Sequence, residues 1–162
     1  ALEYRGPSGA VELTTGGAGG PPQRFYVPDN VRIIGTMNSA DRSIALVDYA
    51  LRRRFRFVEL EPDPQVLDTW LAAHGVDAAA RVVILDLFRR LNTRLSEALD
   101  PDHRLGHTYF MRSPMTAAGL DRLWRTAIRP LLAEYFVPPT GEIEEYTDLV
   151  VRAARELESH ER

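Results

Sequence analysis

The chain has 162 residues, of which 44% are hydrophobic and 27% are charged, and these proportions are typical of a globular domain with its own core. It has no cysteine, four scattered histidines and no run of about 18 consecutive apolar residues, which excludes a disulfide framework, a thiolate zinc site and a helical membrane span. The 20 basic and 23 acidic residues give a net charge of −3, which offers no overall attraction for nucleic acid. We expect a cytoplasmic protein.

The first 22 residues predict a helix end followed by a long loop. Ala1–Gly6 is typical of the last turn of a helix that glycine terminates, so we expect the sequence to begin in mid-domain. Glycine, threonine and proline dominate Pro7–Pro22, which flanks a short predicted strand at Val11–Thr14. The glycine-rich residues 16–22 suit either a surface linker or a loop that contacts a pore or a partner.

The next segment predicts a strand, a helix and a second strand. Val31–Met37 is apolar and rich in β-branched residues, as in a buried central strand of a parallel sheet. Cap and turn residues over Asn38–Ser43 lead into a predicted helix at Ile44–Arg53, and Phe55–Leu60 predicts the following strand. This order defines a βαβ unit with a right-handed crossover. We therefore predict an α/β fold with a partial parallel sheet.

The chain changes character after Pro62-Asp63-Pro64, where helices replace strands. A short helix is predicted near Gln65–His74, and three longer helices follow from apolar residues that recur at intervals of three and four. The predicted core positions of these three helices are Ile84, Leu85, Phe88, Leu91, Leu95 and Leu99; Leu120, Leu123, Trp124, Ala127, Ile128, Leu131 and Tyr135; and Ile143, Tyr146, Leu149, Val150, Ala153 and Leu157. We accordingly place an α/β domain over residues 1–61 and a four-helix domain over residues 62–162.

Candidate site residues cluster around the first predicted βα turn. Asn38 ends the most apolar strand, where open parallel sheets bind ligands, and its amide can both donate to a phosphate oxygen and accept from an attacking water. A simple turn-shaping role is the alternative. Asp48 lies four residues before Arg52, the spacing of an ordinary helical ion pair. Arg53 and Arg54 remain available, either for a site or for the C-terminal end of the helix, where cations are favoured.

These residues form a recognisable pattern. The sequence Gly35-Thr36-Met37-Asn38-Ser39-Ala40-Asp41-Arg42-Ser43, continuing through Ala45-Leu46-Val47-Asp48-Tyr49-Ala50-Leu51-Arg52-Arg53-Arg54-Phe55, closely resembles the sensor 1 to arginine finger region of the McrB family. That family comprises GTP-hydrolysing AAA+ subunits of modified-cytosine restriction systems. The resemblance extends from Phe25 to Pro62 and, more weakly, to Leu105–Phe110. It implies that residues 1–61 are the C-terminal part of an AAA+ P-loop NTPase core and residues 62–162 its all-α lid.

The resemblance implies catalytic roles for four residues. Asn38 corresponds to sensor 1, which contacts the γ-phosphate or the attacking water. Arg53 corresponds to the arginine finger, which enters the active site of the neighbouring protomer. Arg54 and Asp48 correspond to accessory charges at the same interface.

Two further residues are implied on the nucleotide side. Asp41 helps to order the site, and His107 is a lid residue near the nucleotide, with a surface or packing role as its alternative. The implied nucleotide is GTP, or ATP, with Mg²⁺, bound mainly by residues missing from this chain. All 20 basic residues are arginine, and a Walker A loop requires a lysine. No metal ligand is predicted in the chain itself. We therefore expect a fragment that does not hydrolyse nucleotide alone.

A finger that acts in trans implies a closed ring of subunits, a homo-hexamer by family expectation. The resemblance also implies a McrC-like endonuclease subunit as partner and contact with DNA through a domain that is not in this chain, with no membrane involved. Two alternatives stay open. One is an ATP-hydrolysing AAA+ remodeller of the MoxR or dynein-related kind, and the other is a non-catalytic half-domain that docks onto a complete ring.

Overall fold

The structure is a computed structural model, and it describes residues 4–13, 23–37, 52–137 and 142–160. The contacts within the chain divide it into two compact units, Ala1–Glu59 and Leu60–Arg162. Leu60–Arg162 is called the helical unit.

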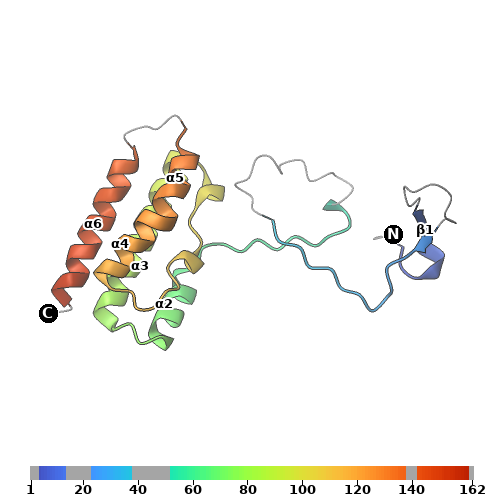
Figure 1. Cartoon of the computed structure of the whole chain (residues 1–162), viewed down its shortest axis with the longest axis horizontal. Helices are drawn as coiled ribbons and strands as arrows, with labels where there is room; N and C mark the ends of the chain where they lie inside the picture. The colour runs from blue at the N-terminus through green and yellow to red at the C-terminus, as the bar shows by residue number, and fades with distance from the viewer. Residues whose placement is uncertain (1–3, 14–22, 38–51, 138–141, 161–162) are drawn as a thin grey trace. The chain divides into compact units, whose positions relative to one another are not determined.

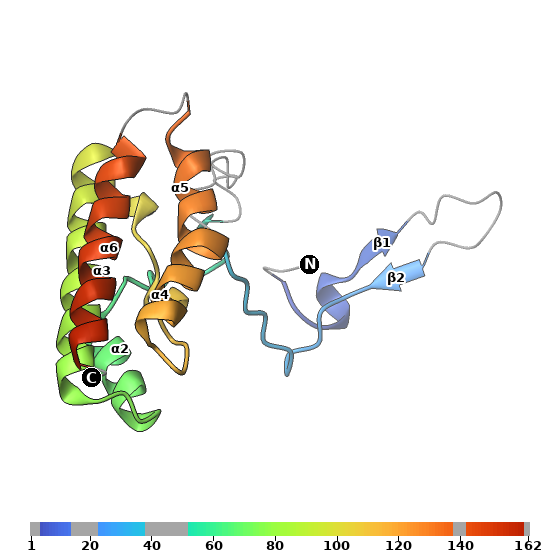
Figure 2. The ribbon, with the colours of Figure 1, turned by 60° about the vertical axis from the view of Figure 1, so that its left-hand side comes forward.

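The first unit contains a short antiparallel hairpin (Figure 2). Its strands are β1 (Val11–Leu13), which confirms the strand predicted near the start of the chain, and β2 (Gln23–Phe25). Val11 lies opposite Phe25 and Leu13 opposite Gln23. A 3₁₀ turn, η1 (Pro7–Gly9), precedes the hairpin and follows Gly6, whose φ of 74° lies in the left-handed region that favours glycine.

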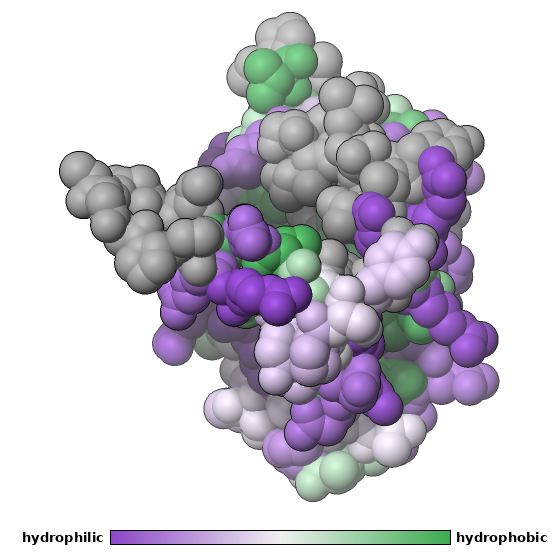
Figure 3. Space-filling model, turned by 90° about the vertical axis from the view of Figure 1, so that its right-hand side faces the viewer, coloured by the Kyte–Doolittle hydropathy of each residue, from purple (hydrophilic) through white to green (hydrophobic). Residues whose placement is uncertain are grey.

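Residues 31–37 and 55–60, predicted as strands of a parallel sheet, form no strand in the structure. Ile34 and Leu60 are 93% and 89% exposed, where a central strand would bury them. These segments form no strand because the backbone N–H and C=O groups of a strand need a neighbouring strand as hydrogen-bond partner. Among the described residues, β1 and β2 are the one pair of strands that supply each other with such partners. On the face that Figure 3 shows, green apolar atoms lie among purple hydrophilic ones. The described residues therefore do not form the predicted sheet.

The helical unit is a bundle of α2 (Pro64–Ala73), α3 (Ala78–Ala98), α4 (Ala117–Leu123), α5 (Arg129–Tyr135) and α6 (Glu142–His160). The two longest helices, α3 and α6, pack along each other, α4 also packs against α6, and α2 packs against α3 (Figure 1). The chain after Asp63 is thus mostly helical, as its apolar periodicity predicts. None of the described helices has a stretch long and apolar enough to cross a bilayer.

Local signals set the ends of α2. The Asp63 carboxylate caps its first turn by accepting from the Gln65 N–H at 2.7 Å, and Pro64 follows at the first helical position, where its missing N–H costs nothing. At the other end, Gly75 adopts a φ of 79°, and the Val76 N–H donates to the Leu71 carbonyl at 3.1 Å. This is the Schellman geometry that stops a helix and turns the chain toward the next one.

The segment between α4 and α5 is π-helical, η5 (Trp124–Ile128), so the Arg129 N–H donates to the Trp124 carbonyl five residues earlier. Buried residues recur through this region at intervals of four, at Leu120, Trp124, Ile128, Leu132 and Phe136. In a regular α-helix each step of four residues drifts by about 40° around the axis. The wider π turn absorbs this drift, which keeps the buried residues of α4 and α5 on one face.

One hydrophobic core fills the helical unit. Every core position predicted from the apolar periodicity is either buried or packed against this core. Two buried rings, Phe88 of α3 and Phe110 of the loop that follows it, meet edge to face with centroids 5.4 Å apart. Aromatic pairs favour this geometry, which adds about 0.5–1.5 kcal/mol to the effect of burial. The core thus includes the loop as well as the helices.

Candidate functional site

The predicted catalytic residues lie only partly within the described residues. Asn38, Asp41 and Asp48 lie outside them. Arg53 and Arg54 are exposed and occupy a turn. The guanidinium carbon of the preceding residue, Arg52, lies 5.9 Å from the centroid of the Phe57 ring, within the range of a cation–π contact.

The best-defined polar site of the helical unit is the loop over residues 99–112, which joins α3 toward α4. It contains two 3₁₀ turns, η3 (Pro101–His103) and η4 (His107–Tyr109). Asn92, buried in α3, fixes the middle of the loop with both ends of its amide. Its Nδ2 donates to the Leu105 carbonyl at 3.1 Å, and its Oδ1 accepts from the Leu105 N–H at 2.6 Å. The backbone N–H and carbonyl of the buried Leu105 therefore both have a hydrogen-bond partner.

His103, in the first half of the loop, is a buried imidazole with two neighbours. Its Nδ1 lies 2.7 Å from Asp100 Oδ1, and its ring meets Tyr135 of α5 edge to face at 4.7 Å. Burial raises the pKa of Tyr135, with smaller contributions from Tyr109 and Glu134. These contacts join the loop to α5, and they give His103 a packing role.

His107, in the second half of the loop, contacts the start of the helical unit. Its Nδ1 accepts from the Asp63 N–H at 3.1 Å, across 44 residues of sequence. Three residues earlier in the loop, Arg104 forms an ion pair of 3.6 Å with Glu61. The loop therefore contacts the segment Leu60–Asp63 at two points, immediately before α2 begins.

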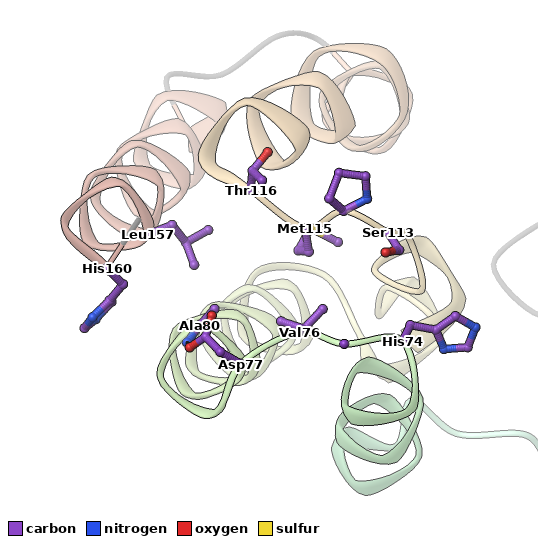
Figure 4. Close-up of a pocket in the computed structure, with 11 residues that line it drawn as sticks. His74, Val76, Asp77, Ala80, Ser113, Met115, Thr116, Leu157 and His160 are labelled. Atoms are coloured by element: carbon purple, nitrogen blue, oxygen red, sulfur yellow. The ribbon is translucent and has the colours of Figure 1, made fainter. Parts of the chain in front are cut away.

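A separate hollow of about 160 Å³ lies between the α2–α3 turn, the start of α4 and the end of α6 (Figure 4). His74 and His160 lie on opposite sides of it, and Asp77 lies beside Ala80. Among the described residues, no three His, Asp or Glu side chains come together in a way that could hold a metal ion. The described polar side chains that line this hollow therefore do not form a metal-binding cluster.

Asp77 has a structural role at the edge of this hollow. Its carboxylate caps α3 by accepting from the Ala80 N–H at 2.9 Å. That hydrogen bond, more than any other contact, holds the pKa of Asp77 below its usual value of 3.8, and further backbone N–H groups and the charge of His160 act in the same direction.

The lowered pKa of Asp77 predicts a pH-dependent contribution to stability. A depressed folded-state pKa stabilises the fold above the unfolded-state value near 3.8, and this stabilisation is lost as the pH falls through the folded-state value. Asp77→Asn keeps the capping oxygen but does not titrate. We expect the wild type to have the higher urea midpoint at pH 7, and the difference to shrink toward pH 3. An unchanged difference down to pH 2 would contradict the assignment.

Comparisons with known proteins identify the helical unit. Residues 83–144 match the family described as McrB, alpha-helical lid domain. The chain is 36% identical over 156 residues to the EcoKMcrB subunit of the type IV methyl-directed restriction enzyme of Escherichia coli (strain K12), which covers 90% of this chain and 34% of that protein. It is 30% identical over 96 residues to component YdiS of the type II restriction enzyme BsuMI of Bacillus subtilis (strain 168), covering 57% of this chain and 28% of that protein.

The fold and the comparisons together define the class of the helical unit, which is an all-α lid domain. The chain is a McrB-type sequence that contains the alpha-helical lid of that family. It spans about a third of the length of the curated relatives it matches.

Sequence reasoning did not find two residues that organise the 99–112 loop. Asn92 was missed because a single polar residue within an apolar helical stripe gives no hint of the loop that it binds. The backbone N–H of Asp63 was missed because a side-chain pattern does not reveal main-chain donors. The sequence did offer one indication of this contact. Asn92 follows Leu91 at a core-facing position of α3, and a buried amide requires hydrogen-bond partners.

Proposed function

We propose that this chain is part of the nucleotide-hydrolysing AAA+ motor of a modified-DNA restriction system, with GTP as its nucleotide. The observation that carries the proposal is the 36% identity to the EcoKMcrB subunit along 90% of this chain. The relative named as a component of the BsuMI restriction enzyme supports the same biological setting. The McrB lid over residues 83–144 supports the assignment of the helical unit.

In this proposal the chain contributes residues to two active sites. Asn38 acts as sensor 1 and orients the attacking water at the γ-phosphate, with Asp41 ordering the same site. Arg53 acts as an arginine finger in the site of the neighbouring subunit, with Arg54 and Asp48 beside it. The exposure of Arg53 supports this role, because a finger that acts in trans must reach out of its own subunit.

Residues outside this chain would supply the remaining parts of the motor. The phosphates and Mg²⁺ would be bound there, since a Walker A loop requires a lysine and the chain has none. The subunits would form a hexameric ring in the cytoplasm. A McrC-like endonuclease subunit and a separate DNA-recognition domain would complete the system.

Hydrolysis of GTP and ATP by the full-length protein that contains this chain tests the proposal. We expect kcat/KM for GTP to exceed that for ATP by at least about tenfold, equivalent to about 1.4 kcal/mol of transition-state discrimination. Asn38→Ala should abolish most of the GTP hydrolysis while nucleotide binding persists. A preference for ATP would assign the protein to the AAA+ remodellers instead, and binding without hydrolysis of either nucleotide would indicate a non-catalytic module.

A further inference from the structure

The segment that leads into the helical unit is fixed to the 99–112 loop just before the first helix begins. We call Leu60–Asp63 the entry segment. Its Asp63 N–H donates to His107 Nδ1 at 3.1 Å, and Glu61 forms the 3.6 Å ion pair with Arg104. The ion pair is long and its Glu61 side is exposed, so it contributes little. The hydrogen bond to the half-buried His107 is therefore the stronger of the two contacts.

The loop that receives this hydrogen bond is itself well anchored. Asn92 binds both backbone groups of Leu105, Phe110 is fully buried against Phe88, and η4 packs against α2. A side chain held on both flanks in this way can fix the backbone that it contacts. Leu60, at the far end of the entry segment, is 89% exposed.

We propose that His107 is a positioning residue, which fixes the backbone of the entry segment and with it the direction in which the chain enters the lid. Arg53 lies seven residues before Leu60. This inference rests on the proposed function in one respect: if Arg53 is a trans finger, the backbone that the contact between His107 and Asp63 fixes is the one that leads from the finger into the lid.

The chemistry of the contact distinguishes this role from direct nucleotide binding. Because Nδ1 accepts the Asp63 N–H, the neutral ring carries its proton on Nε2. In asparagine at position 107, Oδ1 is separated from Cα by the same number of covalent bonds as Nδ1 is in histidine, so it can accept the same hydrogen bond. Alanine has no acceptor in its side chain. The pair His107→Asn and His107→Ala therefore separates the hydrogen bond from the imidazole.

Amide hydrogen exchange of Asp63, measured by NMR on the 162-residue chain, tests the contact without any assumption about nucleotide. We expect exchange at Asp63 to be about tenfold faster in His107→Ala and close to wild type in His107→Asn. The Ala80 amide, which is bound by Asp77, should be unchanged in both variants and serves as the internal control. Equal exchange at Asp63 in the wild type and His107→Ala would overturn the proposal.

Steady-state GTP hydrolysis by the full-length protein tests the consequence. A displacement of about 1 Å in a catalytic group can cost on the order of 10²-fold, so we expect His107→Ala to lower kcat about 10- to 100-fold with KM for GTP unchanged. His107→Asn should restore most of kcat. A raised KM in both variants would instead make the imidazole a nucleotide ligand and overturn the positioning role. If the wild type hydrolyses no nucleotide, the proposed function fails, while the exchange measurement still decides the contact.

Discussion

Replacing Arg53 with alanine is expected to lower kcat for GTP hydrolysis by the assembled full-length protein by a factor on the order of 10³–10⁵. The reason is that a guanidinium delivered to the transferring phosphoryl group stabilises charge that develops in the transition state and is absent from the ground state. Nucleotide affinity should change little. Phosphate release measured under saturating GTP, beside nucleotide binding, separates the two quantities.

Subunit mixing makes the Arg53 prediction specific to a finger that acts in trans. Arg53→Ala subunits retain Asn38, and Asn38→Ala subunits retain Arg53, so a mixed ring contains interfaces at which both residues are intact. We expect each variant alone to be inactive and the mixture to recover measurable hydrolysis. Arg56→Ala is the matched control, because Arg56 is also exposed, and it should retain activity. No recovery on mixing would show that Arg53 does not act across the interface.

Removing the ring of Phe110 is expected to destabilise the helical unit by about 3–5 kcal/mol, the usual cost of truncating a buried phenylalanine to alanine. Phe110 is 0% exposed and contacts Phe88 edge to face, so the variant would lose both the buried area and the aromatic contact. Urea denaturation of the 162-residue chain, followed by far-ultraviolet circular dichroism, measures the change, because the helices give most of that signal.

Two companion variants keep the Phe110 prediction testable even when Phe110→Ala fails to fold. Phe110→Leu preserves most of the buried volume and should lose clearly less stability than Phe110→Ala. Val82→Ala removes an apolar side chain that is 67% exposed on α3, and it should change stability by no more than about 0.5 kcal/mol. A Phe110→Ala chain as stable as Val82→Ala would show that the loop is not part of the core.

The helices could be predicted from the sequence because their determinants are local. Apolar residues such as Ile84, Phe88 and Leu91 recur with the period of an α-helix, and the hydrogen bonds of a helix lie within the same segment. Short-range signals also set the helix ends, as Asp63 and Thr116 show by capping α2 and α4. The helical domain could therefore be predicted without knowledge of how the helices pack, and the resemblance to McrB implied that it is a lid.

Features that depend on distant partners could not be predicted in the same way. Residues 31–37 have a strand-like composition, but a strand requires a neighbour that composition alone does not identify. β2 was missed because Gln23 and Arg24 are both polar, so the segment lacks the apolar alternation that β1 shows, and it forms a strand by pairing with β1. The hydrogen bond between Asp63 and His107 spans 44 residues and involves a backbone N–H. The candidate catalytic residues Asn38, Asp41 and Asp48 still rest on the resemblance to McrB, and their placement stays a prediction.

The π-helical turn at Trp124–Ile128 has a consequence for how this lid tolerates changes in length. Deleting one residue there would let α4 and α5 merge into one regular α-helix with complete backbone hydrogen bonding. With that residue removed, Leu132 would follow Trp124 after seven residues of regular α-helix, which is about 700° or nearly two full turns, so Leu132 and Phe136 would keep their buried face. The same deletion inside α5 would instead rotate everything after it by about 100° and take apolar side chains out of the core. Homologous lids should accordingly tolerate the loss of one residue at this turn better than the loss of one residue within α5.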